Sequence, residues 1–215
     1  MSFELYYHPL SSYCWKALIA LYEAEIPFEK HLVDLQDPAD RAAFLKVTPL
    51  GKFPVLVDTQ LDRRFPESSI LIEYLAQNVP SAARLVPTSR DLSLQVRAAD
   101  RFFDLYVMQP MGKIVEDRLR PEGERDPRGV ADAHVMLDKT YAITESFLPK
   151  SGWAVGADFS LADCAAAPAL FYANKVHPLT AAAPYTRAYC ERLSTRPSFA
   201  RVLREAEPFM SMFPG

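Results

Sequence analysis

The chain has 215 residues, of which 49% are hydrophobic and 24% charged, and its formal net charge is -3. This composition is typical of a globular protein with a sizeable core, in one large or two modest domains. Net charge this small, spread along the chain, argues against nucleic-acid and anionic-membrane partners, and no uncharged run is long enough to span a bilayer. The N-terminus shows no secretory signal, and three scattered cysteines form no metal or disulfide framework, so we expect no metal and a cytoplasmic location.

The first predicted elements are a strand over residues 3–8 and a helix that begins near Tyr13. The apolar side chains of this helix recur at i, i+3, i+4 and i+7, the spacing of one buried face: Trp15, Leu18, Ile19 and Tyr22. Lys16 and Glu23 lie off that face. We therefore expect both charged side chains to be in solvent.

The chain then continues to alternate between strands and helices. Residues 28–33 read as a second strand, and Asp37 followed by Pro38 is a typical start for a helix reaching about residue 46. A third strand follows Pro54, and residues 60–65 predict a return strand. The next helix opens at residues 66–69 with these side chains on one face: Ile70, Leu71, Tyr74 and Leu75. A right-handed crossover makes the first two strands parallel, and the later pair is antiparallel.

Residues 79–89 lack periodicity and predict a linker, after which every pattern is helical. The expected helices cover residues 90–118 (bent at Pro110), 129–148, an alanine-rich stretch after residue 160, and about 185–193 and 198–206. Ser160 and Asp163 are spaced as a capping box. The predicted organisation is an α/β domain over residues 1–79, a linker over 80–89 and an all-helical domain over 90–215.

The turn over residues 49–58 combines two prolines with a glycine before a short apolar run. Pro54 cannot donate to a sheet, so it should stand at the start of the third strand. Should the Phe53–Pro54 bond be cis, the backbone N–H and C=O of Phe53 would face outward, and a peptide-like ligand would pair with them as an added strand. The alternative is an ordinary loop-to-strand proline.

Three segments should converge beyond the ends of the strands: residues 9–13, 52–54 and 66–69. Two of them present backbone N–H groups at a helix N-terminus, which favours an anion. The third presents a peptide-like edge. The sequence thus predicts a small ligand with carboxylates, amides and an acidic group near Ser11.

These motifs together resemble the glutathione transferase family, and the match runs across most of the chain. They are Tyr6-Tyr7-His8-Pro9 with Ser11-x-x-Cys14, Pro49-Leu50-Gly51-Lys52-Phe53-Pro54, Pro66-Glu67-Ser68 with Ile70-Leu71 and Tyr74-Leu75, and Ser160-Leu161-Ala162-Asp163. The resemblance, to serine-type members like the bacterial zeta, delta and theta enzymes, implies a thioredoxin-like N-terminal domain and an all-helical C-terminal domain. It also implies a homodimer and a detoxifying transferase that uses glutathione as co-substrate and needs no other cofactor.

The resemblance also implies which residues hold glutathione. The Phe53 backbone, before Pro54, would bind the cysteinyl part, and Glu67 and Ser68 the γ-glutamyl end. Lys52 reaches either a ligand carboxylate or only solvent. The full expected set is Ser11, Lys52, Phe53, Pro54, Glu67 and Ser68, with Ser11 as the catalytic residue that donates a hydrogen bond to the glutathione sulfur.

Several of these side chains have other interpretations. Ser11 would also serve as a helix cap, a role that fits Ser12 better. Tyr7 is either the sulfur donor, as in tyrosine-type members of the family, or a core residue. Cys14 stands where the second cysteine of a redox pair would fall, but Ser11 replaces the first, so a buried helix position is favoured. His8 is expected to be structural.

The electrophile would lie between the domains, against an apolar set: Phe103, Tyr106, Val107, Met111, Met210 and Phe213. An aromatic stripe at helical spacing also fits a core. Tyr13 replaces the cysteine of the zeta Ser-Ser-Cys signature, which argues against isomerisation of maleylacetoacetate. The leading hypothesis is conjugation of glutathione to a small apolar electrophile. The alternatives are a glutathione-dependent isomerase or dehalogenase, and a non-catalytic protein-interaction module on the same fold.

Overall fold

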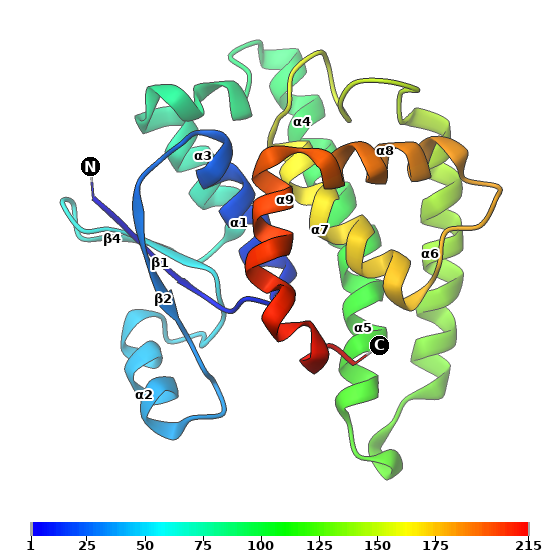
Figure 1. Cartoon of the computed structure of the whole chain (residues 1–215), viewed down its shortest axis with the longest axis horizontal. Helices are drawn as coiled ribbons and strands as arrows, with labels where there is room; N and C mark the ends of the chain where they lie inside the picture. The colour runs from blue at the N-terminus through cyan, green and yellow to red at the C-terminus, as the bar shows by residue number, and fades with distance from the viewer. Residues whose placement is uncertain (1, 215) are drawn as a thin grey trace.

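A four-stranded sheet in the order β2–β1–β3–β4 forms the centre of the N-terminal part of the computed structural model, which describes residues 2–214 (Figure 1). Its strands are β1 (Phe3–Tyr7), β2 (Phe28–Leu32), β3 (Val55–Asp58) and β4 (Arg63–Phe65). β1 pairs parallel with β2 and antiparallel with β3, which pairs antiparallel with β4. The predicted pairing directions are confirmed, although the return strand is shorter than expected.

Helices cover both faces of this sheet: α1 (Ser12–Glu23), α2 (Pro38–Val47) and α3 (Ser68–Asn78). Leu56 packs with α1 and α3 on one face, whereas Phe44 of α2 packs on Val55 and Val57 on the other. The alternation along β3 therefore separates two layers of core. On α3, Leu71, Ile72, Tyr74 and Leu75 are buried, but Ile70 is 53% exposed. Its predicted place on the buried face was wrong, because the helix turns residue 72 inward instead.

The segment predicted to be a linker contains regular structure. Pro80–Leu85 form a short 3₁₀ helix, and Ala82 and Leu85 in it are completely buried. The turn packs on α1 and α3. The lack of helical periodicity in the sequence reflects the three-residue repeat of this turn and not an unstructured connection.

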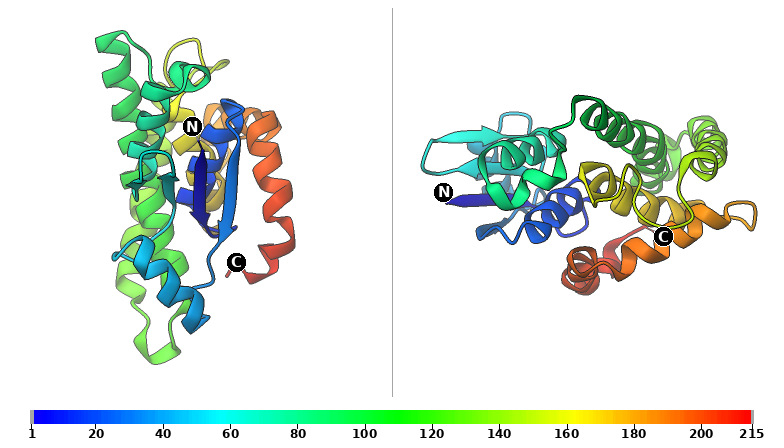
Figure 2. Two further views of the ribbon diagram at one scale, coloured as in Figure 1. Left: turned by 90° about the vertical axis from the view of Figure 1, so that its left-hand side faces the viewer. Right: turned by 90° about the horizontal axis from the view of Figure 1, so that it is seen from above.

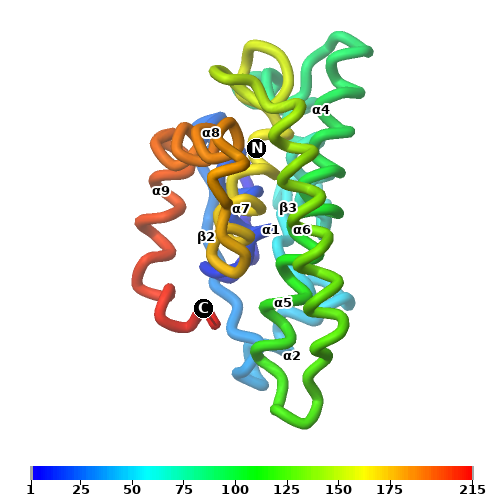
Figure 3. Tube along the Cα trace, turned by 90° about the vertical axis from the view of Figure 1, so that its right-hand side faces the viewer, coloured from blue at the N-terminus to red at the C-terminus, as the bar shows by residue number. Residues whose placement is uncertain are grey.

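The C-terminal part is a bundle around α7 (Leu161–Val176). The other helices are α4 (Arg90–Phe102), α5 (Gln109–Leu119), α6 (Pro127–Phe147), α8 (Pro184–Thr195) and α9 (Pro197–Ala206). Seen from above, α7 lies between α4–α5 on one side and α8–α9 on the other (Figure 2), and the end-on trace shows it between α9 and α6 (Figure 3). Its alanines let these neighbours approach closely, and the predicted capping box is present, with the Ser160 N–H donating to Asp163 Oδ2 at 2.9 Å.

None of the helices in residues 2–214 is both long and apolar enough to cross a membrane.

The expected bend at Pro110 takes the form of a π-helical turn, Phe103–Met108, that joins α4 to α5. Pro110 has no N–H for the carbonyl of Tyr106, four residues earlier. Thr140 of α6 donates its hydroxyl to that carbonyl at 2.9 Å. The wide turn therefore leaves the backbone paired while it changes which side chains face α7.

Helix α1 has no solvent face, so the prediction that Lys16 and Glu23 are exposed was wrong. The helix packs against α3 on the sheet side and against α7 and α9 of the bundle. Lys16 is 0% exposed and Glu23 is 9% exposed. Each is instead paired with opposite charges from elsewhere in the chain, because a buried charge is tolerated only when it is paired.

Candidate active site

Two cavities border the first turn of α1 and the residue before it. The first, of about 250 Å³, includes Tyr13 in its wall, and the second, of about 350 Å³, includes Ser11 and Ser12. The first is lined mainly by the N-terminal part and by the segment from the end of α4 through the π-helical turn to the start of α5, the second by the α1 N-terminus, α5 and the C-terminal segment. A larger cavity of about 580 Å³ near Tyr22 contains none of the expected site residues.

The first cavity brings together five of the six residues expected to hold glutathione: Lys52, Phe53, Pro54, Glu67 and Ser68. The Phe53–Pro54 bond is cis. Among residues 2–214, the Phe53 N–H and C=O have no hydrogen-bond partner. Gly51 adopts φ 59°, which an L side chain rarely takes, so the turn before this edge depends on a glycine. A free backbone edge thus borders the cavity.

The N-terminus of α3 borders the same cavity. Glu67 is its N-cap but makes no side-chain capping bond, and Ser68 is 5% exposed. The first N–H groups of a helix have no partner within the helix, and the helix dipole favours negative charge beside them. The exposed Glu67 carboxylate and the α3 N–H groups therefore offer an acceptor and a set of donors at one end of the cavity.

Ser11 is the sixth expected residue and lines the second cavity. It is the N-cap of α1, where its Oγ accepts a hydrogen bond from the Cys14 N–H at 3.4 Å. The cap is thus Ser11, and the better fit of Ser12 to that role was wrong, since Ser12 already has helical geometry as the first residue of α1. Accepting through a lone pair leaves the hydroxyl proton of Ser11 able to donate to a ligand.

The other polar side chains near Ser11 are less suited to sulfur chemistry. Tyr7 lines neither cavity and packs against the core; burial and the nearby Glu205 raise its pKa. Cys14 is completely buried, and burial raises the pKa of its thiol to about 12. His8 lines the second cavity, accepts the Leu10 N–H at Nδ1 (3.2 Å), and has its pKa lowered by burial.

Of the side chains predicted to line the electrophile site, Met111 and Phe213 line the second cavity and the others do not. Phe103 and Val107 have no exposed surface and belong to the core around α7. Tyr106 is 48% exposed outside the cavity, and Met210 packs on the core. For Phe103 and Val107 the structure therefore matches the alternative interpretation of this stripe, which is core packing. The apolar wall includes instead Val115, Leu119, Tyr172 and Met212.

The first cavity also includes Tyr13, from the predicted 9–13 segment, and residues that the sequence pattern did not single out: Arg101, Asp104, Leu105 and Gln109. Burial raises the pKa of Tyr13 to about 12, with Asp104 nearby adding to the effect. Arg101 and Asp104 are three residues apart, so they lie on the same face of a helix. This spacing is the sequence signal that could have identified them as neighbours.

One cluster in residues 2–214 has the residue types of a metal site: Glu4, Glu29 and His31, with ligand atoms within 4.8 Å of one another. His31 Nε2 lies 3.5 Å from Glu4 and 3.6 Å from Glu29. None of the three lines either cavity. A metal there would have no contact with a ligand in the candidate active site.

The similarity of this chain to known proteins extends over most of its length. Residues 5–83 match the glutathione S-transferase N-terminal domain, and residues 127–192 match the glutathione S-transferase C-terminal domain. Glutathione S-transferase GstB of Escherichia coli K12 is 25% identical over 194 residues, which cover 87% of this chain and 91% of GstB. The stringent starvation protein A homolog of Coxiella burnetii is 27% identical over 209 residues, which cover 94% of this chain and 92% of that protein.

Among solved structures, a glutathione S-transferase from Methylobacillus flagellatus with glutathione bound is similar at a TM-score of 0.83 and 26% identity. The similarity covers 93% of this chain and 98% of that one. The glutathione transferase Ure2p8 of Phanerochaete chrysosporium, at 23% identity and a TM-score of 0.84, shares the fold. The thioredoxin-like N-terminal fold with an all-helical C-terminal domain is thereby confirmed.

Proposed function

The chain belongs to the glutathione S-transferase family, and on that premise we propose that it conjugates glutathione to a small apolar electrophile. Glutathione occupies the first cavity, and the electrophile occupies the second. The observation that carries the proposal is the position of Ser11 at the start of α1, in the wall of the second cavity and two residues before Tyr13 of the first, with its Oγ accepting from the Cys14 N–H.

Each part of glutathione has a complementary group in the first cavity. The cysteinyl backbone pairs with the free edge of Phe53 in the manner of an added strand. The γ-glutamyl end reaches Glu67, Ser68 and the N-terminus of α3, and Lys52 faces the glycyl carboxylate. This pose directs the sulfur toward Ser11 and the mouth of the second cavity.

The reaction follows from thiolate chemistry. A free thiol with a pKa near 8.5 is mostly protonated at neutral pH, and lowering the pKa by about two units requires roughly 2.7 kcal/mol of preference for the anion. One hydroxyl hydrogen bond to an anion contributes about 1.5–3 kcal/mol, and the N-terminus of α1 about 0.3–1 kcal/mol. The thiol proton leaves to solvent, the sulfur forms a bond to the electrophilic carbon, and the leaving group departs with its electron pair.

The test is an absorbance titration of the thiolate of bound glutathione. Ser11→Ala should raise the pKa of that thiol by about one to two units and slow turnover of a generic aryl halide, whereas Tyr7→Phe should leave the titration unchanged. Ser12→Ala is the matched control, since Ser12 is the neighbouring serine and lines the same cavity. An unchanged titration in Ser11→Ala would exclude Ser11 as the sulfur donor.

We also propose that residues 80–89 separate the glutathione-binding domain (1–79) from the helical domain (90–215), and that the protein is a cytoplasmic, detoxifying homodimer. Two exposed apolar side chains support the dimer, Ile70 on α3 and Leu94 on α4, at 53% and 65% exposure. Light scattering during size exclusion gives the mass in solution. The mass of a single chain at micromolar concentration would contradict the dimer.

A second candidate is a non-catalytic protein-interaction module. It is supported by a relative similar over nearly the whole chain whose name is not that of a transferase, the stringent starvation protein A homolog. Retention on glutathione resin together with turnover of an aryl halide supports the transferase. A folded protein that does neither supports the module.

A further inference from the structure

The loop between β1 and α1 carries Ser11, and most of its backbone is held by its own neighbours. The Leu10 N–H donates to His8 Nδ1 at 3.2 Å, and the Pro9 carbonyl accepts from Trp15 Nε1 at 2.5 Å. The Ser11 N–H donates to the His8 carbonyl at 3.1 Å, and the Ser11 carbonyl accepts from the Trp15 N–H at 3.0 Å. All of these partners belong to the loop itself or to the first turn of α1.

The Leu10 carbonyl is held from the other domain. It accepts a hydrogen bond from the hydroxyl of Tyr172 on α7, 162 positions later in the chain, at 2.9 Å. Within residues 2–214, no other hydrogen bond joins the backbone of this loop to the helical bundle. The Leu10 carbonyl and the Ser11 nitrogen belong to one planar peptide unit. The tyrosine hydroxyl therefore fixes the orientation of the peptide that leads directly into Ser11.

Tyr172 is itself held firmly. It is 1% exposed, and its ring packs on Trp15 and Phe213 with centroids 4.6 and 5.1 Å apart. Burial raises the pKa of Tyr172, so the hydroxyl keeps its proton. A tyrosine hydroxyl has one proton to donate, and Leu10 takes it. Tyr172 thus forms part of the wall of the second cavity without a proton left for a ligand.

We propose that Tyr172 is a positioning residue for sulfur activation. By holding the Leu10 carbonyl, it sets the direction of the Ser11 hydroxyl toward the glutathione sulfur. The assignment rests on the proposed function, because Tyr172 acts only through Ser11. Hydrogen bonds weaken steeply as they lengthen and bend, so a small rotation of the Leu10–Ser11 peptide weakens the bond to the sulfur. The helical domain then contributes to the thiolate and not only to the electrophile site.

A purely structural role for Tyr172 makes a different prediction, and the chain offers a matched control. Tyr141 on α6 donates its hydroxyl to the His177 carbonyl, also at 2.9 Å. It is 6% exposed and lines neither cavity. Tyr172→Phe and Tyr141→Phe therefore each keep a buried ring and leave one backbone carbonyl without its donor. Their melting temperatures should fall by similar amounts.

The experiment is the absorbance titration of the thiolate of bound glutathione. Tyr172→Phe should raise the pKa of that thiol by about half a unit to one unit, a part of the effect expected for Ser11→Ala. Tyr141→Phe should leave that pKa unchanged. Calorimetry with S-methylglutathione, whose sulfur cannot ionise, should show the same affinity as the wild type for both variants, within about twofold. A structural role alone would lower the melting temperature without moving the thiol pKa.

The double variant Ser11→Ala with Tyr172→Phe tests whether the tyrosine acts through the serine. Its thiol pKa should equal that of Ser11→Ala, because without the Ser11 hydroxyl there is no donor left to position. A further rise would show that Tyr172 acts on the sulfur by another route and would overturn the assignment. Should Tyr172→Phe fail to fold, Phe213→Leu loosens the packing on Tyr172 and keeps its hydroxyl. It should raise the thiol pKa in the same direction, and an unchanged pKa there would overturn the assignment too.

The outcomes separate the assignment from the proposed function. An unchanged thiol pKa in Tyr172→Phe, together with a raised one in Ser11→Ala, overturns the role of Tyr172 alone. An unchanged pKa in Ser11→Ala removes Ser11 as the sulfur donor, and the assignment of Tyr172 fails with it. A wild-type protein that does not bind glutathione overturns the proposed function and this assignment together.

Discussion

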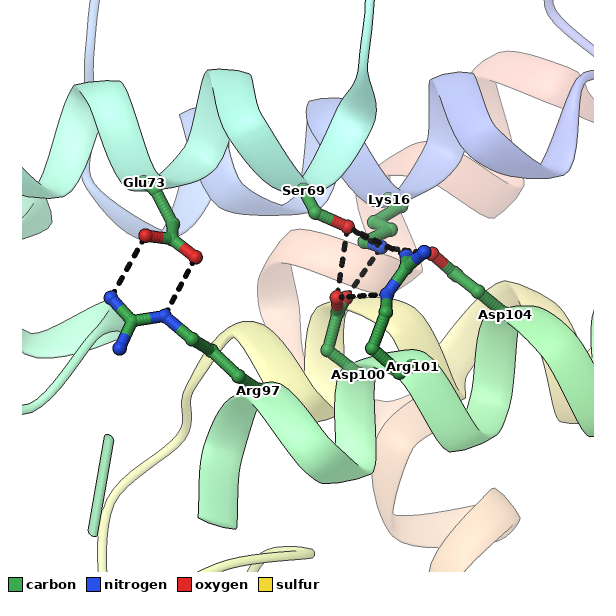
Figure 4. Close-up of polar contacts among 7 residues, drawn as sticks. All are labelled: Lys16, Ser69, Glu73, Arg97, Asp100, Arg101 and Asp104. Atoms are coloured by element: carbon green, nitrogen blue, oxygen red, sulfur yellow. Dashed lines mark hydrogen bonds and ion pairs between the residues drawn. The ribbon is translucent and has the colours of Figure 1, made fainter. Parts of the chain in front are cut away.

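The two ends of α1 each bury a charge, but only one end leaves a polar atom without a partner. At the C-terminal end, Glu23 accepts from Arg196 Nε and Nη2 at 2.7 Å each, from Ser198 at 2.6 Å and from Arg84 at 3.2 Å. At the other end, Lys16 pairs with Asp100 and Asp104 (Figure 4). The cluster around Lys16 contains Asp104 Oδ1, which is buried and has no hydrogen-bond partner in residues 2–214.

The difference separates a cluster whose carboxylate oxygens are all paired from one that leaves a buried oxygen without a partner. Every oxygen of Glu23 is occupied by the protein itself, so this cluster only fastens α1 to the 3₁₀ turn and to α9. An orphaned buried oxygen costs free energy in the empty protein and is stable there only because the surrounding fold is stable. The predictions below change one end at a time and compare stability with ligand binding.

The largest effect is expected from Lys16→Met, which keeps the length of the side chain but leaves Asp100 and Asp104 without their central cation. Breaking a buried ion pair by removing one partner costs about 3–5 kcal/mol. Urea unfolding measures the loss, with Lys139→Met on the exposed side of α6 as control. Equal stability of the two variants would mean that the cluster is not held together by Lys16.

Glu23→Gln should cost less, about 2–3 kcal/mol, because the arginines it releases are partly exposed and regain water. The same urea experiment measures it, with Glu191→Gln on the exposed side of α8 as control. The affinity for S-methylglutathione, a glutathione whose sulfur cannot ionise, should not change when measured by calorimetry. A changed affinity would show that the two ends of α1 are coupled and would break the comparison.

The sequence predicted most of the fold because its signals are local. Alternating strands, the Asp37–Pro38 helix start and the Ser160–Asp163 box depend on residues a few positions apart, and all three are present in the structure. Lys16 and Glu23 could not be placed in this way. The pattern of α1 has one apolar stripe, but the charges that allow the rest of the helix to be buried come from residues up to 175 positions away.

The residues of the candidate site also differ in whether local sequence signals could identify them. Residues before α4 were found from short motifs and gather in the first cavity: Lys52, Phe53, Pro54, Glu67 and Ser68. The residues from the bundle were largely missed: Phe103 and Val107, in the π-helical turn, pack in the core instead of lining a cavity. Asp104 was missed because an unpaired buried oxygen is a property of the tertiary structure.

The two ends should also respond to acid in opposite directions. Burial acts to raise the pKa of Glu23, but hydrogen bonds from Arg196 and Ser198 outweigh it and lower the pKa below 4.5. The unfolded chain therefore takes up this proton first, and the stability that Glu23 contributes is lost as the pH falls below about 4.5. For Asp104, burial raises the pKa above 3.8, so its contribution to stability increases as the pH falls toward about 3.8.

Urea unfolding of the wild type, Glu23→Gln and Asp104→Asn, from neutral pH down to about pH 4 and below, measures both contributions. The stability gap between the wild type and Glu23→Gln should shrink in acid. The wild type should gain stability relative to Asp104→Asn over the same range. Parallel curves for all three proteins would mean that neither carboxyl group titrates differently in the folded state.

The smallest effect is expected from removing one hydroxyl at each end. Ser198→Ala takes away one of four hydrogen bonds to Glu23, so about 1–2 kcal/mol of stability should be lost, with no change in peptide binding. Ser69→Ala takes away the hydroxyl that donates to Asp100 and accepts from Lys16 and Arg101. Its stability loss should be similar, but Arg101 then loses an anchor beside the cavity, so binding of S-methylglutathione should weaken severalfold. Calorimetry on the two alanine variants tests this difference. Binding should weaken in Ser69→Ala and stay unchanged in Ser198→Ala, although the two variants lose similar stability.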